Sequence, residues 1–182
     1  MIFGEKIITL KDGRTAILKS PCVENAEMLL NYIKTCCSET DFLSRSPEEW
    51  DISVEQEAAW IERMRSSDDC LAITCYVDGK VAGNCELRFL KGIKISHRAG
   101  IGIAILKEYW NLGIGTSMFN EMIITAKNKG IEILELEYLE GNDRGKALYE
   151  KFGFETVCVR PCAVKLKNGT YKSEIFMQMY LH

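Results

Sequence analysis

A glycine turn between an apolar strand and an amphipathic helix is the feature that most constrains how this chain can fold. The run from Ile103 to Leu106 is apolar, and Gly113 and Gly115 then flank a single isoleucine. Apolar residues recur at helical spacing from that turn as far as Ala126. The segment therefore predicts a strand, a tight turn and a helix in succession.

Such a turn is suited to an anion, because glycines let the backbone come close to a bulky group. The helix N-terminus adds unpaired N–H groups and the positive end of the helix dipole, which favour a pyrophosphate. The turn is not a P-loop, since no Gly-Lys-Ser/Thr follows, and it is not the dinucleotide fingerprint, since Met118 stands at the third glycine position. A Gly-x-Gly pattern also serves close packing, so both interpretations stay open.

Apolar periodicity and turn residues predict the other elements. Asp-Gly pairs at 12–13 and 78–79 are typical of hairpin turns. Strands are expected at 7–10, 15–18, 70–77, 80–90, 98–106, 131–138, 154–166 and 171–181. Helices are expected at 23–37, from Ser53 (with Gln56 at capping-box spacing), at 113–129 and at 143–152. This order predicts a mixed α/β (α+β) sheet in a single domain of residues 1–182.

The composition excludes several classes of protein. Of the 182 residues, 47% are hydrophobic and 27% are charged, which is ordinary for a globular protein and unlike a disordered, fibrous or membrane protein. No apolar run approaches the ~20 residues of a membrane span, and residues 1–6 lack the pattern of a signal peptide. The net charge of −3 gives no general electrostatic reason to bind nucleic acid. We therefore expect a cytoplasmic protein without membrane or nucleic-acid partners.

Eight cysteines raise the question of disulfides or a metal site. None of the cysteines forms a Cys-x-x-Cys pair. The chain has only two histidines, His97 and His182, that could assist the cysteines in binding a metal. Several of the cysteines lie among strand-like apolar residues. We therefore expect reduced thiols that pack as small hydrophobic side chains, and no metal.

Two motifs resemble those of the GNAT family of N-acetyltransferases. Residues 110–115, Trp-Asn-Leu-Gly-Ile-Gly, are similar to the acetyl-CoA-binding motif Gln/Arg-x-x-Gly-x-Gly/Ala, with Trp110 at the Gln/Arg position. Residues 142–154, Asn-Asp-Arg-Gly-Lys-Ala-Leu-Tyr-Glu-Lys-Phe-Gly-Phe, are similar to the family's Asn-x-x-Ala-x-x-Leu-Tyr-Glu-Lys-x-Gly-Phe, with Gly145 in place of the first alanine. Because both motifs occur in the correct order, the chain is identified as a member of this family.

The resemblance implies a fold and a donor site. The fold would be a mostly antiparallel twisted sheet, flanked by helices and splayed where acetyl-CoA, the co-substrate, binds. The Ile103 N–H would polarise the acetyl carbonyl, and Ala104 and Ile105 would hold the pantetheine arm. Asn142 would either cap its helix or hold that arm. The phosphates would lie on the turn formed by Trp110, Asn111, Leu112, Gly113, Ile114, Gly115 and Thr116.

The resemblance also implies catalytic residues. Tyr149 matches the general acid of the family, which protonates the departing thiolate, although a helix tyrosine packed on the sheet is the alternative. Some members place a glutamate where this chain has Ala99. The base is then sought first in Glu86, on the face of its strand opposite Val81, Cys85 and Phe89, with His97, Glu137 and a water relay as alternatives. Direct transfer of the acetyl group requires no cysteine nucleophile.

The implied function is transfer of acetyl from acetyl-CoA to a primary amine of a small molecule or a protein N-terminus. The alternative is a non-catalytic acyl-CoA-binding module of the same fold. Residues 22–67 would form a wall of the acceptor pocket. The strand at 171–181 is apolar on both faces, which predicts a homodimer in which both faces are buried.

Overall fold

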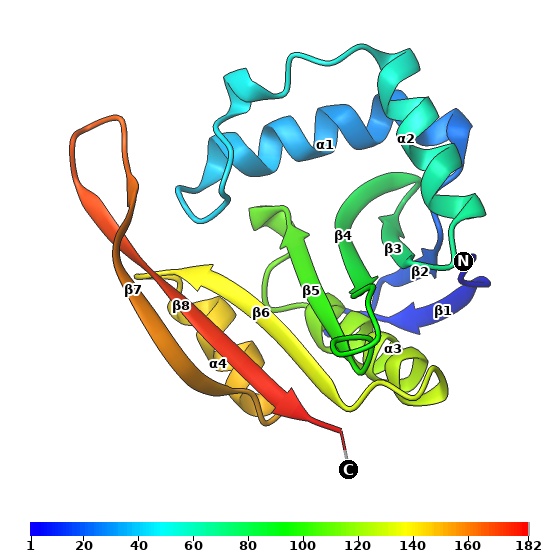
Figure 1. Ribbon diagram of the computed structural model, residues 1–182. Coiled ribbons are helices and arrows are strands. Elements are labelled where there is room, and N and C mark those ends of the chain that lie inside the picture. Colours follow the sequence, from blue (N-terminus) through cyan, green and yellow to red (C-terminus); the bar gives the residue numbers. More distant parts are fainter. Residues whose placement is uncertain (182) are drawn as a thin grey trace.

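The computed structural model describes residues 1–181, and within them it contains one eight-stranded sheet with helices on both faces (Figure 1). The strands lie in the order β1-β2-β3-β4-β5-β6-β8-β7. The strand bounds are β1 Lys6–Thr9, β2 Thr15–Lys19, β3 Cys70–Val77, β4 Lys80–Phe89, β5 Arg98–Ile105, β6 Ile133–Leu139, β7 Glu155–Lys165 and β8 Tyr171–Tyr180. His182, one of the two histidines considered as metal ligands, lies outside the described residues.

The helices begin and end close to the positions that the sequence predicts. Their bounds are α1 Ala26–Glu39, α2 Val54–Ser66, α3 Ile114–Asn128 and α4 Asp143–Lys151, with short 3-10 turns η1 Val23–Asn25, η2 Pro47–Glu49 and η3 Lys107–Tyr109. The capping box at the start of α2 is confirmed, since the Ser53 hydroxyl accepts a hydrogen bond from the Gln56 N–H. Both expected Asp-Gly hairpins also form.

The sheet is antiparallel except between β5 and β6, which confirms the expected mostly antiparallel architecture. These two strands pair in parallel over three positions only, from Arg98 with Ile133 to Gly100 with Glu135. Beyond Gly100 they diverge, and Figure 1 shows the gap widening toward the C-terminal ends of both strands. The sheet therefore has a V-shaped opening in its middle.

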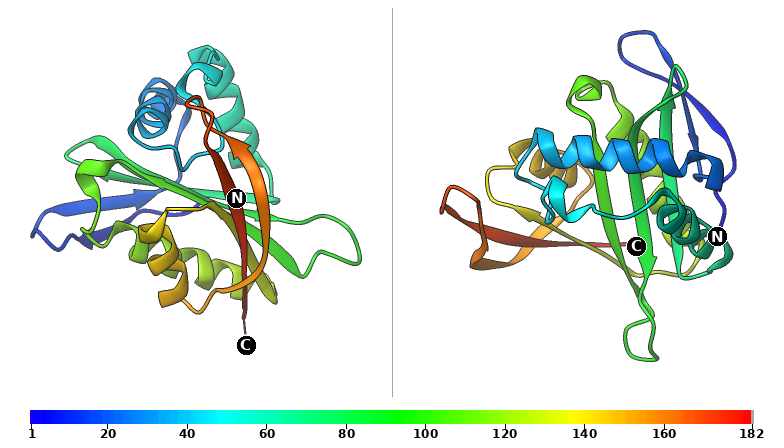
Figure 2. Two further views of the ribbon diagram at one scale, coloured as in Figure 1. Left: turned by 90° about the vertical axis from the view of Figure 1, so that its left-hand side faces the viewer. Right: turned by 90° about the horizontal axis from the view of Figure 1, so that it is seen from above.

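Helices cover the two faces of the sheet in pairs. Figure 2 shows α1 and α2 over one face and α3 and α4 over the other. Met118, Phe119 and Met122 of α3 are fully buried against the sheet. Ile123, on the same helix, is only half-buried. The hydrophobic core includes residues of helices on both faces of the sheet, and on the α3 side it lies against β4 and β5.

Strand β8 lies inside the sheet, between β6 and β7. Both edges of β8 are therefore paired, but only Met177 and Met179 are buried, and Tyr171 and Tyr180 are 55% and 61% exposed, so its two faces are not both covered within one chain. The homodimer stays a prediction, and the edge of the sheet on this side is β7.

All eight cysteines are free thiols. Cys36, Cys37, Cys75 and Cys85 are buried, as expected for small hydrophobic side chains, whereas Cys158 and Cys162 on β7 are exposed. Within residues 1–181, no three His, Cys, Asp or Glu side chains are grouped to hold a metal ion. No helix in this part of the chain has the length and apolar character that crossing a membrane requires.

Candidate active site

A cavity of about 660 Å³ occupies the opening between β5 and β6. On one face of the sheet, residues of α3 and α4 line it, and on the other face Cys36 of α1 and residues of the loop after α1 line it. The cavity therefore connects the two helical layers through the sheet. We refer to its two ends as the α3 end and the α1 end.

The β5 backbone forms one side of this opening. The Leu106 N–H donates to the Ala82 carbonyl of β4, so the alternation of the strand directs the backbone groups of Ile103 and Ile105 away from β4, toward the gap. The Tyr32 hydroxyl bridges the β4–β5 ladder by accepting from the Asn84 N–H (3.0 Å) and donating to the Ala104 carbonyl (2.6 Å). Because α1 completes the ladder in this way, it fixes β5 beside the gap.

The two glycines of the turn serve different purposes. Gly113 has φ of +96° and precedes α3, whose first turn has no side-chain cap and opens on the cavity. At Gly115, a Cβ atom would lie 2.9 Å from Leu148 Cδ2 of α4, so this glycine permits close helix packing. Leu112 does not line the cavity, and its carbonyl accepts a hydrogen bond from the Lys11 N–H. Both the anion-binding and the packing interpretations of the turn therefore have a structural basis.

Basic side chains surround the turn at the α3 end. The Arg144 guanidinium donates to Asn111 Oδ1 (2.7 Å) and stacks 4.3 Å from the Trp110 ring centroid. Lys151 Nζ donates to Thr116 Oγ1 at 3.2 Å. These cations and the uncapped amides of α3 fit a polyanionic group such as a pyrophosphate. The sequence offered no signal for Arg144, because its stacking on Trp110 depends on how α4 packs against the turn.

Asn142 is positioned for both of the roles that the sequence left open. Its side chain accepts a hydrogen bond from the Gly145 N–H (3.0 Å), which makes it the N-cap of α4, and it also lines the cavity. A Cβ at position 145 would lie only 2.7 Å from Asn142 Nδ2. The glycine at this position therefore suits the capping geometry.

Tyr149 lies in an aromatic cluster and borders the cavity. Its ring centroid is 5.7 Å from those of Phe119 and Tyr138, and the residue is 7% exposed. Burial, with a smaller contribution from Tyr138, raises the pKa of Tyr149 to about 12. The phenol therefore keeps its proton across the physiological pH range.

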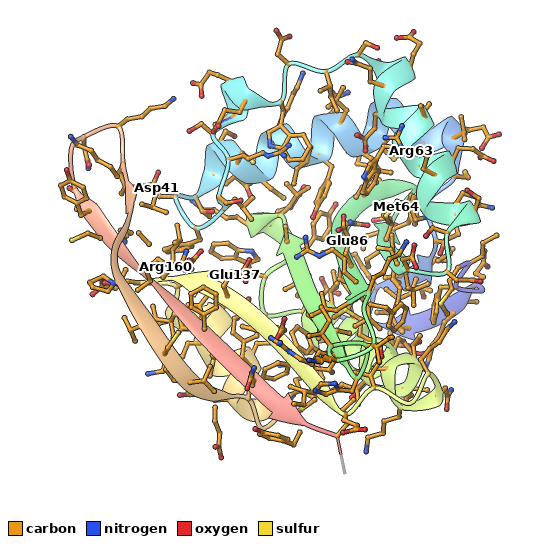
Figure 3. The ribbon with its side chains drawn as sticks, viewed as in Figure 1. Asp41, Arg63, Met64, Glu86, Glu137 and Arg160 are labelled. Carbon is orange, nitrogen blue, oxygen red and sulfur yellow. The ribbon has the colours of Figure 1, made fainter. Side chains whose placement is uncertain are left out.

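The candidate bases lie at different places. Glu137 on β6 is exposed and lines the cavity, whereas Glu86 on β4 is half-buried and does not (Figure 3). Burial raises the pKa of Glu86, which pairs in register with Gly102 on β5. His97 lies before β5, at the closed end of the opening, and its carbonyl accepts from the N–H groups of residues 132 and 133. The structure thus brings Glu137 to the opening, and neither Glu86 nor His97.

The α1 end is bounded partly by the expected region and partly by the β7–β8 hairpin. Thr40, Phe42, Leu43 and Ser44 line it, and so do Val164 and Glu174 of the hairpin, which the sequence did not indicate. Of the acidic residues between α1 and α2, Glu48 forms an ion pair with Lys167 at 2.6 Å. The Glu48 carboxylate thus connects the segment between α1 and α2 to the β7–β8 hairpin.

Comparison with known proteins gives concordant results. The sequence model of the acetyltransferase (GNAT) family matches residues 34–154. A [ribosomal protein bS18]-alanine N-acetyltransferase of Haemophilus influenzae is 35% identical over 79 residues, which are 43% of this chain and 53% of that protein. The chain thus spans about half the length of this curated relative.

Solved structures share the fold. A GNAT-family acetyltransferase from Streptococcus pneumoniae superposes with a TM-score of 0.84 at 23% identity, covering 91% of this chain and 99% of that one. A putative acetyltransferase from Salmonella typhimurium, solved with its cofactor acetyl-CoA, gives a TM-score of 0.77 at 14% identity, covering 92% and 94%. Since the family's sequence model covers most of the chain, including both glycine-turn and α4 motifs, the chain belongs to the acetyltransferase (GNAT) family.

Proposed function

We propose that this protein transfers the acetyl group of acetyl-CoA directly to a primary amine, of a small molecule or of a protein N-terminus. The observation that carries the proposal is the cavity in the V-shaped opening, which joins a cationic turn at its α3 end to a separate entrance at its α1 end. A donor and an acceptor entering from opposite faces of the sheet would meet beside β5. Such a meeting holds two reactants in one geometry, which is a major source of catalysis.

The donor site would use the residues around the glycine turn. The amides from Asn111 to Thr116, together with Arg144 and Lys151, suit the phosphates of acetyl-CoA. The backbone groups of Ile103 and Ile105, directed into the gap, suit the pantetheine arm and the acetyl carbonyl, although the Ile105 carbonyl already accepts from Trp110 Nε1 at 2.7 Å. An N–H aimed at that carbonyl would stabilise the charge that develops on its oxygen.

The chemistry would require a deprotonated amine and a stabilised leaving group. The amine nitrogen forms a bond to the acetyl carbon as the C–S bond breaks, and the proton lost by the amine balances the one gained by the thiol. A thiol has a pKa of ~8.5, so full proton transfer from Tyr149, with a pKa of about 12, is uphill. Tyr149 would therefore act chiefly through a hydrogen bond to the sulfur that strengthens as charge develops there.

The base for the amine would be a carboxylate or a water molecule that it orders. Glu137 is better situated than Glu86, because it lines the opening while Glu86 is separated from it by β5. We propose Glu137 as the group that contacts the acceptor ammonium, and Glu86 as a charge that acts on the site from one strand away.

A panel of amines tests the function against its alternative. Release of CoA with amino acids, polyamines, aminoglycosides and N-terminal peptides would be measured at saturating acetyl-CoA. Transfer to at least one amine supports the enzyme. Tight binding of acetyl-CoA in calorimetry, with no turnover on any amine, would identify a non-catalytic acyl-CoA-binding module instead.

We further propose that residues 1–182 act as one catalytic domain in the cytoplasm. All the strands of the described chain join one sheet, and the two motifs lie on either side of one opening. The eight free cysteines are in keeping with a reducing compartment.

A further inference from the structure

Two side chains of opposite charge line the cavity near its α1 end and form no hydrogen bond or ion pair with residues 1–181. Arg88 on β4 and Glu137 on β6 both line the cavity, and within residues 1–181 neither side chain forms a hydrogen bond or an ion pair. Among the neighbouring charges, Glu174 pairs with Arg160 (2.8 Å) and Arg98 pairs with Glu135, whereas Glu86, on the same face of β4 as Arg88, interacts with Arg88 electrostatically and forms no ion pair within residues 1–181. Arg88 and Glu137 are therefore available to a ligand that carries both charges.

The floor between these two side chains is bare backbone. Register pairs Arg88 with Gly100 and Glu86 with Gly102, so both glycines lie on the face that carries Arg88. A Cβ at position 100 would lie 4.0 Å from Arg88 Nη2, and a Cβ at position 102 would meet nothing within 4 Å. A small molecule can thus lie directly on β5 between the two charges.

Glu137 lies on the same face as these glycines. Register pairs Gly100 with Glu135, and alternation along β6 returns Glu137 to that face, level with Gly102 and across the opening. Figure 3 shows Glu86 and Glu137 on opposite sides of β5. Arg88 and Glu137 are two strands apart, hence at least about 9.5 Å across the sheet at ~4.8 Å per strand spacing. This span, with a long side chain at each end, leaves space for a molecule of amino-acid size.

Contacts of the β7–β8 hairpin border the approach to the α1 end. Lys167, at the tip of the β7–β8 hairpin, pairs with Glu48 of η2 at 2.6 Å. Lys172 donates to the Glu140 carbonyl (2.9 Å) and lies 5.7 Å from the ring centroid of Phe42. These contacts join the hairpin to the loop after α1, which favours a small acceptor over the surface of a folded protein.

We propose that the acceptor is a small zwitterion, an amino acid whose carboxylate binds Arg88 and whose ammonium group contacts Glu137. This inference rests on the proposed acetyl transfer and narrows its acceptor class. In that orientation the amine points along β5 toward Ile103, where the acetyl carbonyl would lie, and the carboxylate points toward Gly100. The guanidinium of Arg88 is a planar fork that matches a carboxylate. It therefore selects the shape of the carboxylate as well as its negative charge.

Matched acceptors test the inference. CoA release would be measured with the twenty standard amino acids, with their α-carboxamides, and with dipeptides that begin with the same residues. An amino acid is expected to exceed its own amide at least tenfold in kcat/KM. The intrinsic chemistry works against that order, because the amine of an amide has a lower pKa and is more often unprotonated at pH 7.5.

Two variants assign the preference to Arg88. Arg88→Gln is expected to lower kcat/KM for the preferred amino acid about 10- to 100-fold, the loss of a charged hydrogen bond, and to reduce the preference over the amide. Arg63 is an exposed arginine on α2 that lies outside the cavity (Figure 3). The control variant Arg63→Gln is therefore expected to behave as wild type. Calorimetry with the amino acid in the presence of CoA measures the contribution of the same contact to binding affinity, without turnover.

The outcomes separate this inference from the proposed function. Transfer that favours amides, polyamines or dipeptides overturns the zwitterion while leaving acetyl transfer intact. Arg88→Gln with wild-type kinetics and binding for the amino acid also overturns it. The absence of transfer to every amine overturns the proposed function, and the acceptor assignment falls with it.

Discussion

Tyr149 combines a ring that packs among aromatic side chains with a hydroxyl at the cavity, and these two roles can be separated. Tyr149→Phe keeps the ring contacts to Phe119 and Tyr138 and removes only the oxygen. If the hydroxyl stabilises the departing thiolate through a hydrogen bond, kcat should fall by about 10²–10³-fold while affinity for acetyl-CoA stays close to normal. Steady-state kinetics at saturating acetyl-CoA measure both.

The pH dependence of kcat provides a second test of the role of Tyr149. With its pKa raised to about 12, Tyr149 stays protonated well above neutral pH, so its titration should not reduce kcat below about pH 10. A kcat for Tyr149→Phe equal to that of wild type, when chemistry limits the rate, would leave Tyr149 with a packing role alone.

Glu57 on α2 is 7% exposed and lies near Glu86, and burial raises the pKa of both carboxyl groups. The native state therefore holds these protons more tightly than the unfolded state, where the pKa of a glutamate is ~4.3. Stability from this source is present below that pH and is lost as the pH rises through the higher native pKa values. Glu57→Gln should thus raise Tm at pH 7 relative to wild type, by about 2–4 °C for each kcal/mol gained, and much less at pH 4.

Thermal unfolding of both proteins at the two pH values checks this expectation. Glu62→Gln, on the exposed side of the same helix, serves as the control and should show a Tm difference that does not change with pH. An equal Tm difference for Glu57→Gln at pH 4 and pH 7 would contradict the argument.

At the scale of elements, the start of α3 depends on a left-handed glycine. Gly113 has φ of +96°, so a β-branched residue would strain the turn as well as crowd the space before the helix amides. Gly113→Val should weaken acetyl-CoA binding at least tenfold, as measured by calorimetry on folded protein.

Gly130 provides a matched control at the other end of the same helix. It has φ of +72°, lies outside the cavity, and a Cβ there would meet nothing within 4 Å. Gly130→Val should cost stability through similar backbone strain yet keep normal affinity for acetyl-CoA. If a folded Gly113→Val protein kept normal affinity for acetyl-CoA, the placement of the phosphates on this turn would be wrong.

For the whole molecule, local signals predicted the elements better than the site. Asp-Gly turns, helical periodicity and the Ser53 capping box depend on neighbouring residues, and all of them form as expected. The choice between Glu86 and Glu137 depends on which strand borders the opening, which is a matter of sheet order. The alternation of side chains along its strand predicted the face on which Glu86 lies. It did not reveal that β5 lies between Glu86 and the opening. Arg88 and Arg144 likewise acquire their roles only through tertiary packing.

Strand order also changes how the dimer is predicted. Because β8 is internal, the exposed edge on its side of the sheet is β7, an eleven-residue strand on which Val157 and Val159 are 53% and 54% exposed. The part of this edge that carries the two valines, before Arg160 and Pro161, is a template for pairing with a second copy. We expect light scattering at micromolar concentration to give twice the mass of one chain.

Two substitutions decide whether that edge is responsible. Val159→Lys adds a charge to the β7 edge and should yield monomers, because lysine on an edge strand opposes pairing. Ile7→Lys alters β1, the four-residue strand at the opposite edge, where Ile7 is 65% exposed, and should leave the dimer intact. A monomeric wild-type protein would refute the dimer outright. A Val159→Lys protein that still dimerises would move the interface away from β7, and the apolar face of that strand would then need another explanation.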